Sequence, residues 1–452
     1  MKVLLIQPPS CDPMTDQIFL FEPLALEYLG AGLKEDGHEV ELLDARLEPD
    51  VESACRRLQP DLVGLTGFTS HVNIVKGIAA RLKALYPELH VVVGGHHATV
   101  CPEDFNDSSI DFVVIGEGVF TLRELVRALE SEGGIRAIKG LAIPCADGML
   151  FTEPRPYTDL NLLPMPDRSL TARHRQSYFS EWFSPLASVR TSLGCTARCN
   201  FCALWGITGG KYLRRDPEAV VEEFKTVAEP NVFFCDDESM CDVKRMDRLA
   251  DLIAAAGIRK NYFLYGRVDT IVNHPELFAK WAKIGLAQVF VGMEDFSDKR
   301  LSAMNKGVTV AQQEQAVRTL DALGIMMYAS YMIDPAYSRE DFRAMLAHVR
   351  RMKHKYATFT VMTPLPGTEL HAKRESELLS RKPELYDMLH ALFPTTLPLE
   401  EFYSEMITLW TKAVPFYRIM PTLARFGPHG MLSRIRMFGR FVDKARKLHL
   451  DY

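Results

Sequence analysis

The 452-residue chain lacks the features that mark a membrane-spanning, secreted or low-complexity protein. No apolar run reaches the roughly 18 residues that a bilayer span needs, and the opening MKVLLIQPPS is too short for a signal peptide. The chain has no low-complexity tract and no short repeat. Hydrophobic residues make up 47% and charged residues 25%, which is ordinary for packed domains. The sequence therefore predicts a cytoplasmic globular protein of two or three domains.

A net positive charge is also missing over most of the chain, where acidic residues outnumber basic ones. The formal net charge of −5 gives no reason to expect a nucleic-acid partner. The segment from Tyr403 to Tyr452 differs, because it holds nine Lys/Arg against three Asp/Glu and its aromatic residues stand among the arginines. Such a tail is typical of a helix that lies on an anionic membrane, and equally of a packed helical cap. Both interpretations stay open, so peripheral membrane contact is one expectation.

The first 140 residues alternate short β-rich runs with helical patterns, which predicts a doubly wound parallel sheet. Ligands of such sheets bind beyond the carboxyl ends of the strands. The loops expected there are rich in glycine, proline and small polar residues, so their backbone can approach a large ligand closely. The candidate binding residues in these loops are Pro8, Pro9, Thr66, Phe68, Thr69, Ser70, His71, Gly94, Gly95, His96, His97, Gly116, Glu117 and Gly118.

A second series of strands and helices begins at Leu186, after a hairpin and a connection marked by prolines. Asp147-Gly148 between two β-rich runs predicts the hairpin, and the connection is the expected domain boundary. Six strand–helix units suit a partial (β/α)6 barrel of the TIM type, with its active site at the carboxyl ends of the strands. We therefore expect an α/β chain in four parts: 1–140, 141–185 (hairpin and linker), 186–388 (barrel) and a helical region 389–452.

Nine cysteines without a secretory signal indicate reduced thiols, and three of them are clustered. Cys195, Cys199 and Cys202 form C-x3-C-x2-C directly after a predicted strand. Three thiolates leave one iron of a 4Fe–4S cluster without a protein ligand, and the amino and carboxylate groups of a methionine can occupy it. The alternative is structural zinc, which normally has four protein ligands. No fourth Cys or His lies in the loop, and His174 is distant, so the cluster is favoured.

This spacing after the first barrel strand resembles the radical S-adenosylmethionine (SAM) superfamily, over roughly Leu186 to Leu370. The resemblance implies that the cluster reductively cleaves SAM and that strand-end side chains bind SAM. Arg267 meets the SAM carboxylate in one interpretation and pairs with Asp269 in the other. The implied SAM contacts are Phe201 for the adenine, Asp236, Asp237 and Glu238 for the methionine amine, Glu294 for the ribose hydroxyls, and Thr363 at the end of the sixth strand.

Two further cysteines, Cys235 and Cys241, lie near the predicted site. Either thiol could quench a radical or donate a proton. Free cysteines are more often small buried hydrophobes, however, so a packing role is the competing interpretation.

A doubly wound domain ahead of such a barrel, with PLPGT at the sixth strand, resembles the cobalamin-dependent class of these enzymes. The segments GLTGFTSHVNIV, VVVGGHHAT and VVIGEGVFTLREL look like the cobalamin loops of that class, which implies a Rossmann-like cobalamin domain. A nucleotide is the alternative ligand, but no G-x-G-x-x-G opens the first helix. The D-x-H-x-x-G segment of many cobalamin proteins is missing too, since Asp36-Gly37-His38 is followed by Glu41 where glycine belongs.

The missing segment leaves the cobalt without an obvious protein ligand. His71 stands where the resemblance places the lower face of the corrin, and a helix-capping or packed histidine is the other interpretation. His96 and His97 follow Gly94-Gly95 and are expected at the edge or tail of the cobalamin.

The resemblance implies a carbon methyltransferase. A 5′-deoxyadenosyl radical would take hydrogen from an unactivated carbon, methylcobalamin would donate the methyl group, and a reductase such as flavodoxin or ferredoxin would supply electrons; cofactors carry chemistry that acid–base groups cannot. An oxidative cyclisation or ring rearrangement with the same cofactors is the alternative. A non-catalytic cobalamin-binding regulator is a third reading, against which the complete cysteine motif argues.

The expected substrate is a hydrophobic small molecule. Predicted barrel-end segments carry apolar groups: Tyr328, Tyr331 and Met332 on the fifth strand and Met362 on the sixth. The stretches PTTLPLEEFYSEM, YGRVDTI and VFVGMED resemble the subgroup of hopanoid C-3 methylases and bacteriochlorophyllide side-chain methylases. That resemblance implies a polycyclic lipid as the substrate.

Overall fold

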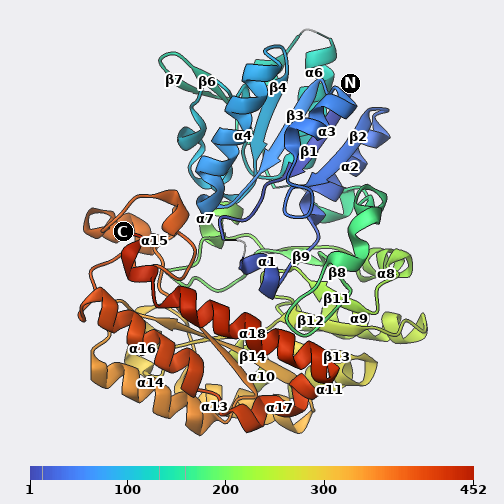
Figure 1. Cartoon of the computed structure of the whole chain (residues 1–452). Coiled ribbons are helices and arrows are strands. Elements are labelled where there is room, and N and C mark those ends of the chain that lie inside the picture. The colour runs from blue at the N-terminus through green and yellow to red at the C-terminus, as the bar shows by residue number, and fades with distance from the viewer. Residues whose placement is uncertain (13, 132, 158) are drawn as a thin grey trace. The chain divides into compact units, whose positions relative to one another are not determined.

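The computed structural model describes residues 1–12, 14–131, 133–157 and 159–452, and its elements are labelled in Figure 1. The chain folds into two compact units, each built on its own large sheet. The first unit contains Met1–Ser188, Ala203–Gly209 and Leu213–Arg215. The second contains Val189–Cys202, Gly210–Tyr212 and Asp216–Tyr452.

The sheet of the first unit has the strand order β2-β1-β3-β4-β5-β6-β7. Its first five strands are parallel, and the last two are added as an antiparallel hairpin. This confirms the predicted doubly wound sheet, with the hairpin extending its edge. The strands are β1 (Lys2–Gln7), β2 (Glu39–Asp44), β3 (Leu62–Thr66), β4 (His90–Gly94), β5 (Phe112–Val114), β6 (Leu141–Cys145) and β7 (Gly148–Phe151).

Helices cover both faces of this sheet, because successive strand residues point to opposite sides. Leu4 and Ile6 of β1 bury in one core together with residues of α3 and α4. Val3 and Leu5 bury in the other core together with residues of α2 and α6. The helices are α1 (Thr15–Ile18), α2 (Leu24–Glu35), α3 (Val51–Leu58), α4 (Val72–Leu85), α5 (His96–Val100), α6 (Gly118–Glu130) and α7 (Leu204–Thr208).

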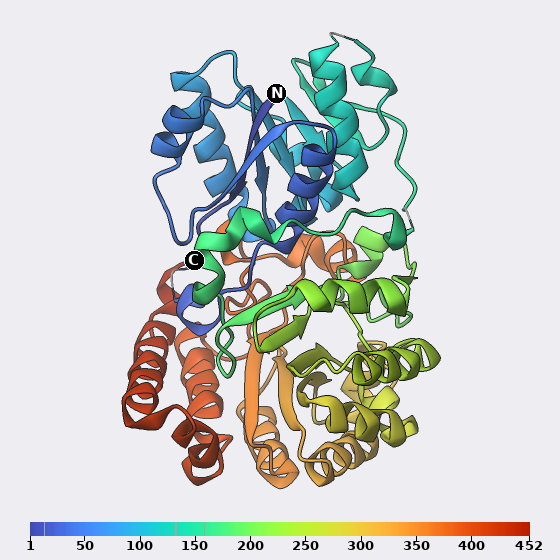
Figure 2. The same ribbon diagram turned by 90° about the vertical axis from the view of Figure 1, so that its right-hand side faces the viewer.

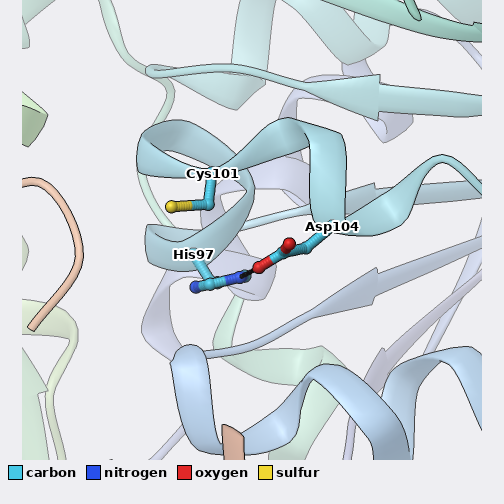
Figure 3. Close-up of side chains that lie close together, drawn as sticks. All are labelled: His97, Cys101 and Asp104. Atoms are coloured by element: carbon cyan, nitrogen blue, oxygen red, sulfur yellow. Dashed lines mark hydrogen bonds and ion pairs between the residues drawn. The ribbon is translucent and has the colours of Figure 1, made fainter. Parts of the chain in front are cut away.

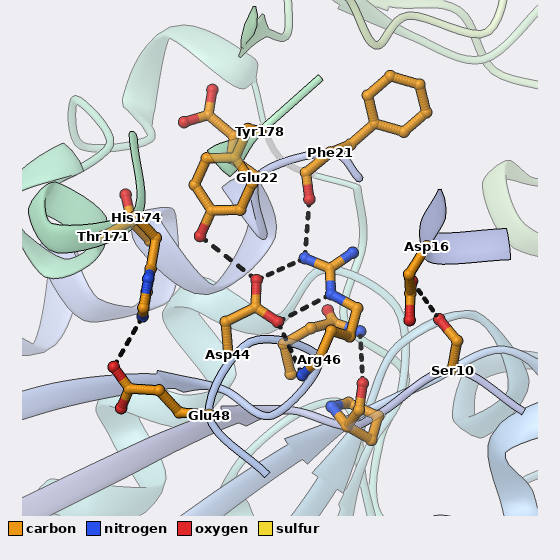
Figure 4. A network of polar contacts seen from close by, with 12 residues as sticks. Ser10, Asp16, Phe21, Glu22, Asp44, Arg46, Glu48, Thr171, His174 and Tyr178 are labelled. Carbon is orange, nitrogen blue, oxygen red and sulfur yellow. Dashed lines mark hydrogen bonds and ion pairs between the residues drawn. The ribbon is translucent and has the colours of Figure 1, made fainter. Parts of the chain in front are cut away.

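A polar network fixes the chain just beyond the end of β2 (Figure 4). Arg46 donates from Nε and Nη2 to the Asp44 carboxylate at 2.8 and 2.6 Å, and Nη2 also donates to the Phe21 carbonyl oxygen at 2.8 Å. The Tyr178 hydroxyl donates to the same carboxylate at 3.3 Å. Asp44 and Tyr178 are fully buried, so these bonds offset the cost of removing them from water. The network holds the segment around η5 (Arg168–Ser177) against the sheet.

The sheet of the second unit has the order β15-β14-β13-β12-β11-β8, so each of its strands lies beside its sequence neighbour in this sheet. The pairs from β11 to β15 are parallel. A six-stranded sheet with this order, parallel from β11 to β15, confirms the predicted partial barrel. Its strands are β8 (Leu186–Val189), most of which precedes the second unit's first residue, β11 (Asn231–Phe234), β12 (Asn261–Tyr265), β13 (Leu286–Glu294), β14 (Met326–Ile333) and β15 (Tyr356–Val361). Two short strands, β9 (Ser192–Leu193) and β10 (Leu213–Arg214), lie outside this sheet.

Helices pack on the outer face of the barrel sheet, as Figure 2 shows for the olive and yellow segments. An aromatic cluster fixes the first of them, since Phe224 of α8 stacks on Phe234 and Trp281 of α11 meets Phe234 edge-on. The helices of this layer are α8 (Pro217–Thr226), α9 (Val243–Ala255), α10 (Val268–Asn273), α11 (Pro275–Ile284), α12 (Asp298–Ala303), α13 (Val310–Ala322) and α14 (Arg339–Met352).

Three longer helices close the chain: α16 (Leu399–Lys412), α17 (Phe416–Ala424) and α18 (Gly427–Ala445). Phe402 of α16 packs edge-on against Phe342 of α14, and Trp410 Nε1 donates to the Phe359 carbonyl oxygen of β15 at 3.0 Å. Figure 2 shows these red helices beside the orange strands. The predicted helical region is confirmed, and no helix within the described residues is long and apolar enough to cross a bilayer.

Candidate functional site

The cysteine loop runs from β9 to α7 and presents Cys195, Cys199 and Cys202. Cys199 is buried and the other two are half-buried. The loop begins at Gly194, whose φ of +93° favours glycine and where a Cβ would lie 1.9 Å from the Lys211 carbonyl oxygen. Burial raises the pKa of the Cys195 thiol to about 11, so a bound metal must supply the stabilisation that turns it into a thiolate.

The donor set fits an iron–sulfur cluster better than zinc. Structural zinc normally has four protein ligands, and the cysteine loop supplies the three thiols of Cys195, Cys199 and Cys202. Three thiolates would leave one iron of a 4Fe–4S cluster open for another ligand.

Asp236, at the carboxyl end of β11, is bonded to its own chain. Its Oδ1 accepts from the backbone N–H groups of Thr191 and Ser192 at 2.6 and 2.8 Å, and its Oδ2 accepts from Thr191 Oγ1 at 2.6 Å. The side chain is 1% exposed. The expectation that Asp236 meets the methionine amine therefore gives way to a supporting role, because its oxygens already hold the strand that leads into the cysteine loop.

The neighbouring carboxylates differ from Asp236 and from each other. Asp237 Oδ2 accepts from the Gly194 N–H at 2.6 Å and so fixes the start of the cysteine loop. Glu238 Oε1 accepts from the Arg267 N–H at 3.3 Å, whereas its Oε2 is buried without a hydrogen-bond partner. Burial raises the pKa of Glu238 to about 8. An unpaired buried carboxylate oxygen calls for a cation, so Glu238 fits the amine of SAM better than either aspartate.

Arg267 pairs with Asp269 through Nε and Nη2, at 3.0 and 3.2 Å. This pairing is one of the two roles expected for Arg267, and contact with the SAM carboxylate stays a prediction. Its Nη2 also donates to the Lys306 carbonyl oxygen at 2.9 Å, and its Nη1 lies 4.0 Å from Cys199 Sγ. The guanidinium is therefore placed to stabilise a cysteine thiolate by charge.

Glu294 ends β13 in an unusual conformation. Its φ is +62°, a left-handed value that costs a non-glycine residue free energy, and the pairing of β13 with β14 shifts register between Gly292 and Glu294. Its Oε1 accepts from Lys306 Nζ at 2.6 Å, and both side chains are about nine-tenths buried. Lys306 is not among the site residues that the sequence predicts; the signal for it is the Asn-Lys-Gly turn that follows a short helix.

The inner face of the barrel sheet carries two rows of different character. Strand register places Tyr265, Phe290, Tyr328 and Tyr356 side by side, with neighbouring ring centroids 4.6–5.0 Å apart. Two residues further along the strands, Gly292, Ser330 and Thr358 are paired. An aromatic floor below small residues leaves room toward the carboxyl ends of the strands, where a barrel binds its ligands.

The rim next to the cysteine loop is apolar. Phe201 and Leu370 pack against a buried cluster of Met304, Met332 and Met362. Phe201 is thus placed to meet a flat apolar group such as adenine. Thr363, by contrast, is buried with its hydroxyl bonded to the Val361 carbonyl oxygen at 3.0 Å, which supports the strand end.

One other barrel expectation needs adjustment, and two cysteines left open by the sequence can be placed. Tyr331 is fully buried, and its hydroxyl lies 2.8 Å from His354 Nε2. It therefore points away from the inner face, contrary to the expectation of a barrel-end apolar group. Burial raises the pKa of Cys235 to about 12, in keeping with the packing interpretation. Cys241 Sγ lies 3.5 Å from Thr196 Oγ1 and so stands beside the cysteine loop.

In the first unit, the β3 loop places Thr66, Phe68, Thr69, Ser70 and His71 at the carboxyl end of the sheet. His71 Nδ1 accepts from the Phe68 N–H at 3.3 Å, and burial lowers the pKa of His71 to about 4. The neutral ring then carries its proton on Nε2, so neither nitrogen offers a free lone pair. The capping interpretation of His71 fits this geometry, and cobalt ligation does not.

His97 is buried at 2% exposure and bonded at both ring nitrogens, and Figure 3 shows its contact with Asp104. Its Nε2 lies 2.7 Å from Asp104 Oδ2, and its Nδ1 lies 3.1 Å from Thr69 Oγ1. Cys101 Sγ lies within 4.8 Å of a ring nitrogen of His97 and a carboxylate oxygen of Asp104. Because a carboxylate can only accept, Nε2 donates to Asp104, and Nδ1 of the neutral ring then accepts from Thr69 Oγ1. His97 therefore supports the β3 loop, which differs from the expected contact with the cobalamin.

The loops at the carboxyl ends of β1, β3, β4 and β5 are here called the cradle. Its remaining residues combine glycine backbone with one exposed ring. Phe68 is 55% exposed and lies 4.9 Å from the His96 ring, an apolar surface that a large ligand would cover. At Gly95 φ is +100° and a Cβ would lie 2.6 Å from Thr66 Oγ1. Pro8, Pro9, Gly94, Gly116 and Gly118 lie in or beside the loops that follow β1, β4 and β5.

Glu117 is the cradle residue whose expected role changes most. Its carboxylate accepts from the N–H groups of Val119 and Phe120, at 2.8 and 3.4 Å, and so caps α6. An acidic cap at a helix N-terminus stabilises the helix itself. Glu117 therefore shapes the loop, and Phe68, His96 and the glycine backbone are the groups that fit a cobalamin.

Comparison with known families divides the chain in the same way. Residues 19–126 match the B12 binding domain, and residues 189–349 match the Radical SAM superfamily. The chain is 30% identical to a hopanoid C-3 methylase of Methylococcus capsulatus over 98% of its own length and 87% of the relative's. It is 27% identical to an anaerobic magnesium-protoporphyrin IX monomethyl ester cyclase of Synechocystis sp., covering 74% and 69%. A bacteriochlorophyllide d C-12(1)-methyltransferase of Chlorobaculum tepidum is 24% identical, covering 90% and 86%.

Two solved structures share the fold of the whole chain. The cobalamin-dependent SAM radical enzyme OxsB, with aqua-cobalamin bound, superposes with a TM-score of 0.77 at 16% identity, covering 99% of this chain and 72% of that one. The radical SAM methyltransferase TsrM of Kitasatospora setae, with cobalamin and a 4Fe–4S cluster bound, gives 0.72 at 19% identity, covering 92% and 89%. The chain therefore belongs to the cobalamin-dependent radical SAM enzymes and is a methyltransferase of that family, with a 4Fe–4S cluster, SAM and cobalamin as its cofactors.

Proposed function

We propose that this enzyme methylates an unactivated carbon of a hydrophobic, polycyclic small molecule. The observation that carries the proposal is the apolar rim beside the cysteine loop, formed by Phe201 and the methionine cluster. Methionine side chains adapt to irregular apolar shapes, and a polar substrate would lose its water against them without gaining hydrogen bonds. Relatives named for hopanoid and bacteriochlorophyllide methylation support the substrate class.

Each group of the second unit has a distinct task in this reaction. When bound, the reduced cluster supplies the electron that cleaves SAM, and cobalamin supplies the methyl group that is transferred. Glu238 Oε2 accepts from the methionine ammonium, and Glu294 accepts from the ribose hydroxyls. Phe201 packs on the adenine. The apolar rim excludes water from the reacting carbon, which keeps a radical from side reactions.

The product balance tests the reaction type. Each methylation consumes one SAM as radical source, giving methionine and 5′-deoxyadenosine, and one as methyl source, giving S-adenosylhomocysteine. We therefore expect 5′-deoxyadenosine and S-adenosylhomocysteine in equal amounts, measured by chromatography with flavodoxin or ferredoxin as the expected electron donor. The relative named as a cyclase favours oxidative cyclisation as the second candidate, and 5′-deoxyadenosine without S-adenosylhomocysteine would select it.

We further propose that the outer face of α17 and α18 rests on an anionic membrane, from which a hydrophobic substrate can be drawn. Five apolar side chains are exposed there, from 40% for Ile435 to 70% for Tyr417. The combination of exposed apolar groups and arginines is what binds a negatively charged bilayer surface. The apolar residues are Phe416, Tyr417, Leu432, Ile435 and Phe438, and the exposed arginines are Arg425, Arg436 and Arg440.

A full-length variant with three surface substitutions tests this contact better than truncation does. Tyr452 Oη bonds to Tyr403 Oη at 2.7 Å and to the Ala391 N–H at 2.6 Å, so removing the tail would also remove packed contacts. We expect L432S/I435S/R436E to lower flotation with phosphatidylglycerol vesicles severalfold at an unchanged melting temperature. Equal flotation of variant and wild type, or equal binding to neutral phosphatidylcholine vesicles, would remove the membrane proposal.

A further inference from the structure

The segment Ala303–Gly307, here called the clasp, touches both halves of the SAM and cluster site. It follows α12 and contains two left-handed residues, Asn305 at φ +53° and Gly307 at φ +74°. Asparagine and glycine are the residue types that adopt such angles most readily. The Asn-Lys-Gly sequence therefore sets a tight turn whose shape depends on these residues.

One side of the clasp holds the cysteine loop. Asn305 Nδ2 donates to the Arg198 carbonyl oxygen at 2.6 Å, and Asn200 donates from its N–H and its Nδ2 to the carbonyl oxygens of Met304 and Ala303 at 3.2 and 2.8 Å. These three bonds flank Cys199 on both sides in the sequence. The clasp thus fixes the backbone that carries the central cluster ligand.

The other side of the clasp enters the barrel. Lys306 is 7% exposed, and its ammonium bonds to Glu294 Oε1 at 2.6 Å. A Cβ built on Gly292 would lie 2.3 Å from that Oε1 and 2.8 Å from Lys306 Nζ. Gly292 belongs to the inner-face row of small residues, so the ion pair lies over the inner face in the space that a side chain at this position would occupy. The pair directs one Glu294 oxygen to the lysine and leaves Oε2 for a ligand.

The clasp also reaches the second positive group of the site. The Lys306 carbonyl oxygen accepts from Arg267 Nη2 at 2.9 Å, and Arg267 Nη1 lies 4.0 Å from Cys199 Sγ. One residue therefore contacts the strand-end carboxylate with its side chain and the cysteine-facing arginine with its backbone. A displacement of Lys306 would be felt at both.

We propose that Lys306 is a positioning residue that couples the SAM-binding carboxylate Glu294 to the cluster-binding cysteine loop. The proposal rests on the proposed function insofar as Glu294 binds SAM. Its physical basis is that a carboxylate buried beside its only cation loses its fixed position when that cation is removed. Without the lysine, Glu294 would turn outward or take up a proton, and either change weakens its bonds to ribose hydroxyls.

The test compares K306M with K306R and with K299M in the reconstituted holoenzyme. Lys299 lies exposed on the same short helix that leads into the clasp, so K299M is the matched control. We expect K306M to weaken SAM binding at least tenfold by equilibrium dialysis, at wild-type iron and sulfide content. The change that SAM causes in the EPR spectrum of the reduced cluster should then require correspondingly more SAM. K306R should recover most of the affinity, and K299M should match the wild type.

Asn305→Gly probes the other side of the clasp, because glycine keeps the left-handed turn while removing the bond to Arg198. We expect N305G to release cluster iron to a chelator severalfold faster, with a smaller loss of SAM affinity than K306M. Wild-type SAM affinity and EPR response in K306M would overturn the proposal. So would a parallel loss of iron, SAM binding and melting temperature in K306M, which would indicate a role in folding alone. These readouts need no methyl acceptor, so a failed methylation test leaves them intact.

Discussion

The SAM and cluster region of the second unit and the cobalamin region of the first unit differ in the groups that they offer to their ligands. In the second unit, the charged side chains of Glu238 and Glu294 are buried after strands β11 and β13, and that of Lys306 is buried against Glu294. In the first unit, the side chains of His71, His97 and Glu117 turn back to the protein, and glycine backbone with the exposed Phe68 remains for the ligand. SAM is small and charged, so fixed charges suit it, whereas cobalamin is large and is held best by many backbone and edge contacts.

This difference predicts that ligand binding in the two regions responds differently to single substitutions. A site made of a few buried charges fails when one is removed, because its partner is left unpaired. In a site formed mainly by backbone groups, a single substitution removes only the binding contribution of one side chain. Substitutions in the second unit should therefore have the larger effects, and the following experiments test that ranking.

The largest effect is expected from replacing Cys195, Cys199 and Cys202 together with alanine. No thiolate would remain to hold iron, so the cluster signal in the EPR spectrum and 5′-deoxyadenosine formation should fall to background. Cobalamin binding, followed by its visible absorption, should stay at the wild-type level because its cradle lies in the first unit. Joint loss of both cofactors would show that the cradle depends on the cysteine loop.

The comparison also explains which parts of this site the sequence predicts. C-x3-C-x2-C and the alternation of strands and helices are local patterns, and the structure has the expected sheets. The roles of Asp236, Glu117 and His97 depend on which distant backbone groups they meet, such as the N–H groups that Asp236 binds 44 and 45 residues away. A strand-end acid has the same sequence signal whether it binds a ligand or its own chain. Lys306 was missed for the same reason, since its partner is set by tertiary contact.

Glu238→Gln is expected to have the second largest effect, and its two consequences have opposite signs. The neutral amide cannot pair with the SAM ammonium, so SAM affinity should fall at least tenfold. The stability of the cofactor-free protein at alkaline pH, by contrast, should rise. Burial raises the pKa of Glu238 to about 8, so the wild type is most stable where this group keeps its proton and loses that stability as pH rises through about 8.

The variant has no such proton to lose. Between pH 5 and pH 9 the unfolding free energy of E238Q should therefore gain a few kcal/mol relative to wild type, since each pKa unit corresponds to about 1.4 kcal/mol. Chemical denaturation at the two pH values measures this difference. Asp237→Asn is the comparison variant, because it removes the neighbouring acid while its amide oxygen can still accept from the Gly194 N–H. A constant gap between E238Q and wild type across this range would contradict the assignment of the buried proton to Glu238.

The smallest effect is expected at His97, although it is as deeply buried as the acids of the other unit. His97 holds Thr69 without offering a nitrogen to the ligand. H97A should therefore weaken cobalamin binding by about five- to tenfold. A lost buried hydrogen bond costs about 1–3 kcal/mol, and only part of that cost falls on the binding of cobalamin. Asp104→Ala, at a half-exposed carboxylate, should do less. The absorption spectrum of bound cobalamin should be unchanged in both variants, because neither touches the cobalt. A shifted spectrum in H97A would place this histidine against the cofactor after all, and the two regions would then be built on more similar plans than their side chains indicate.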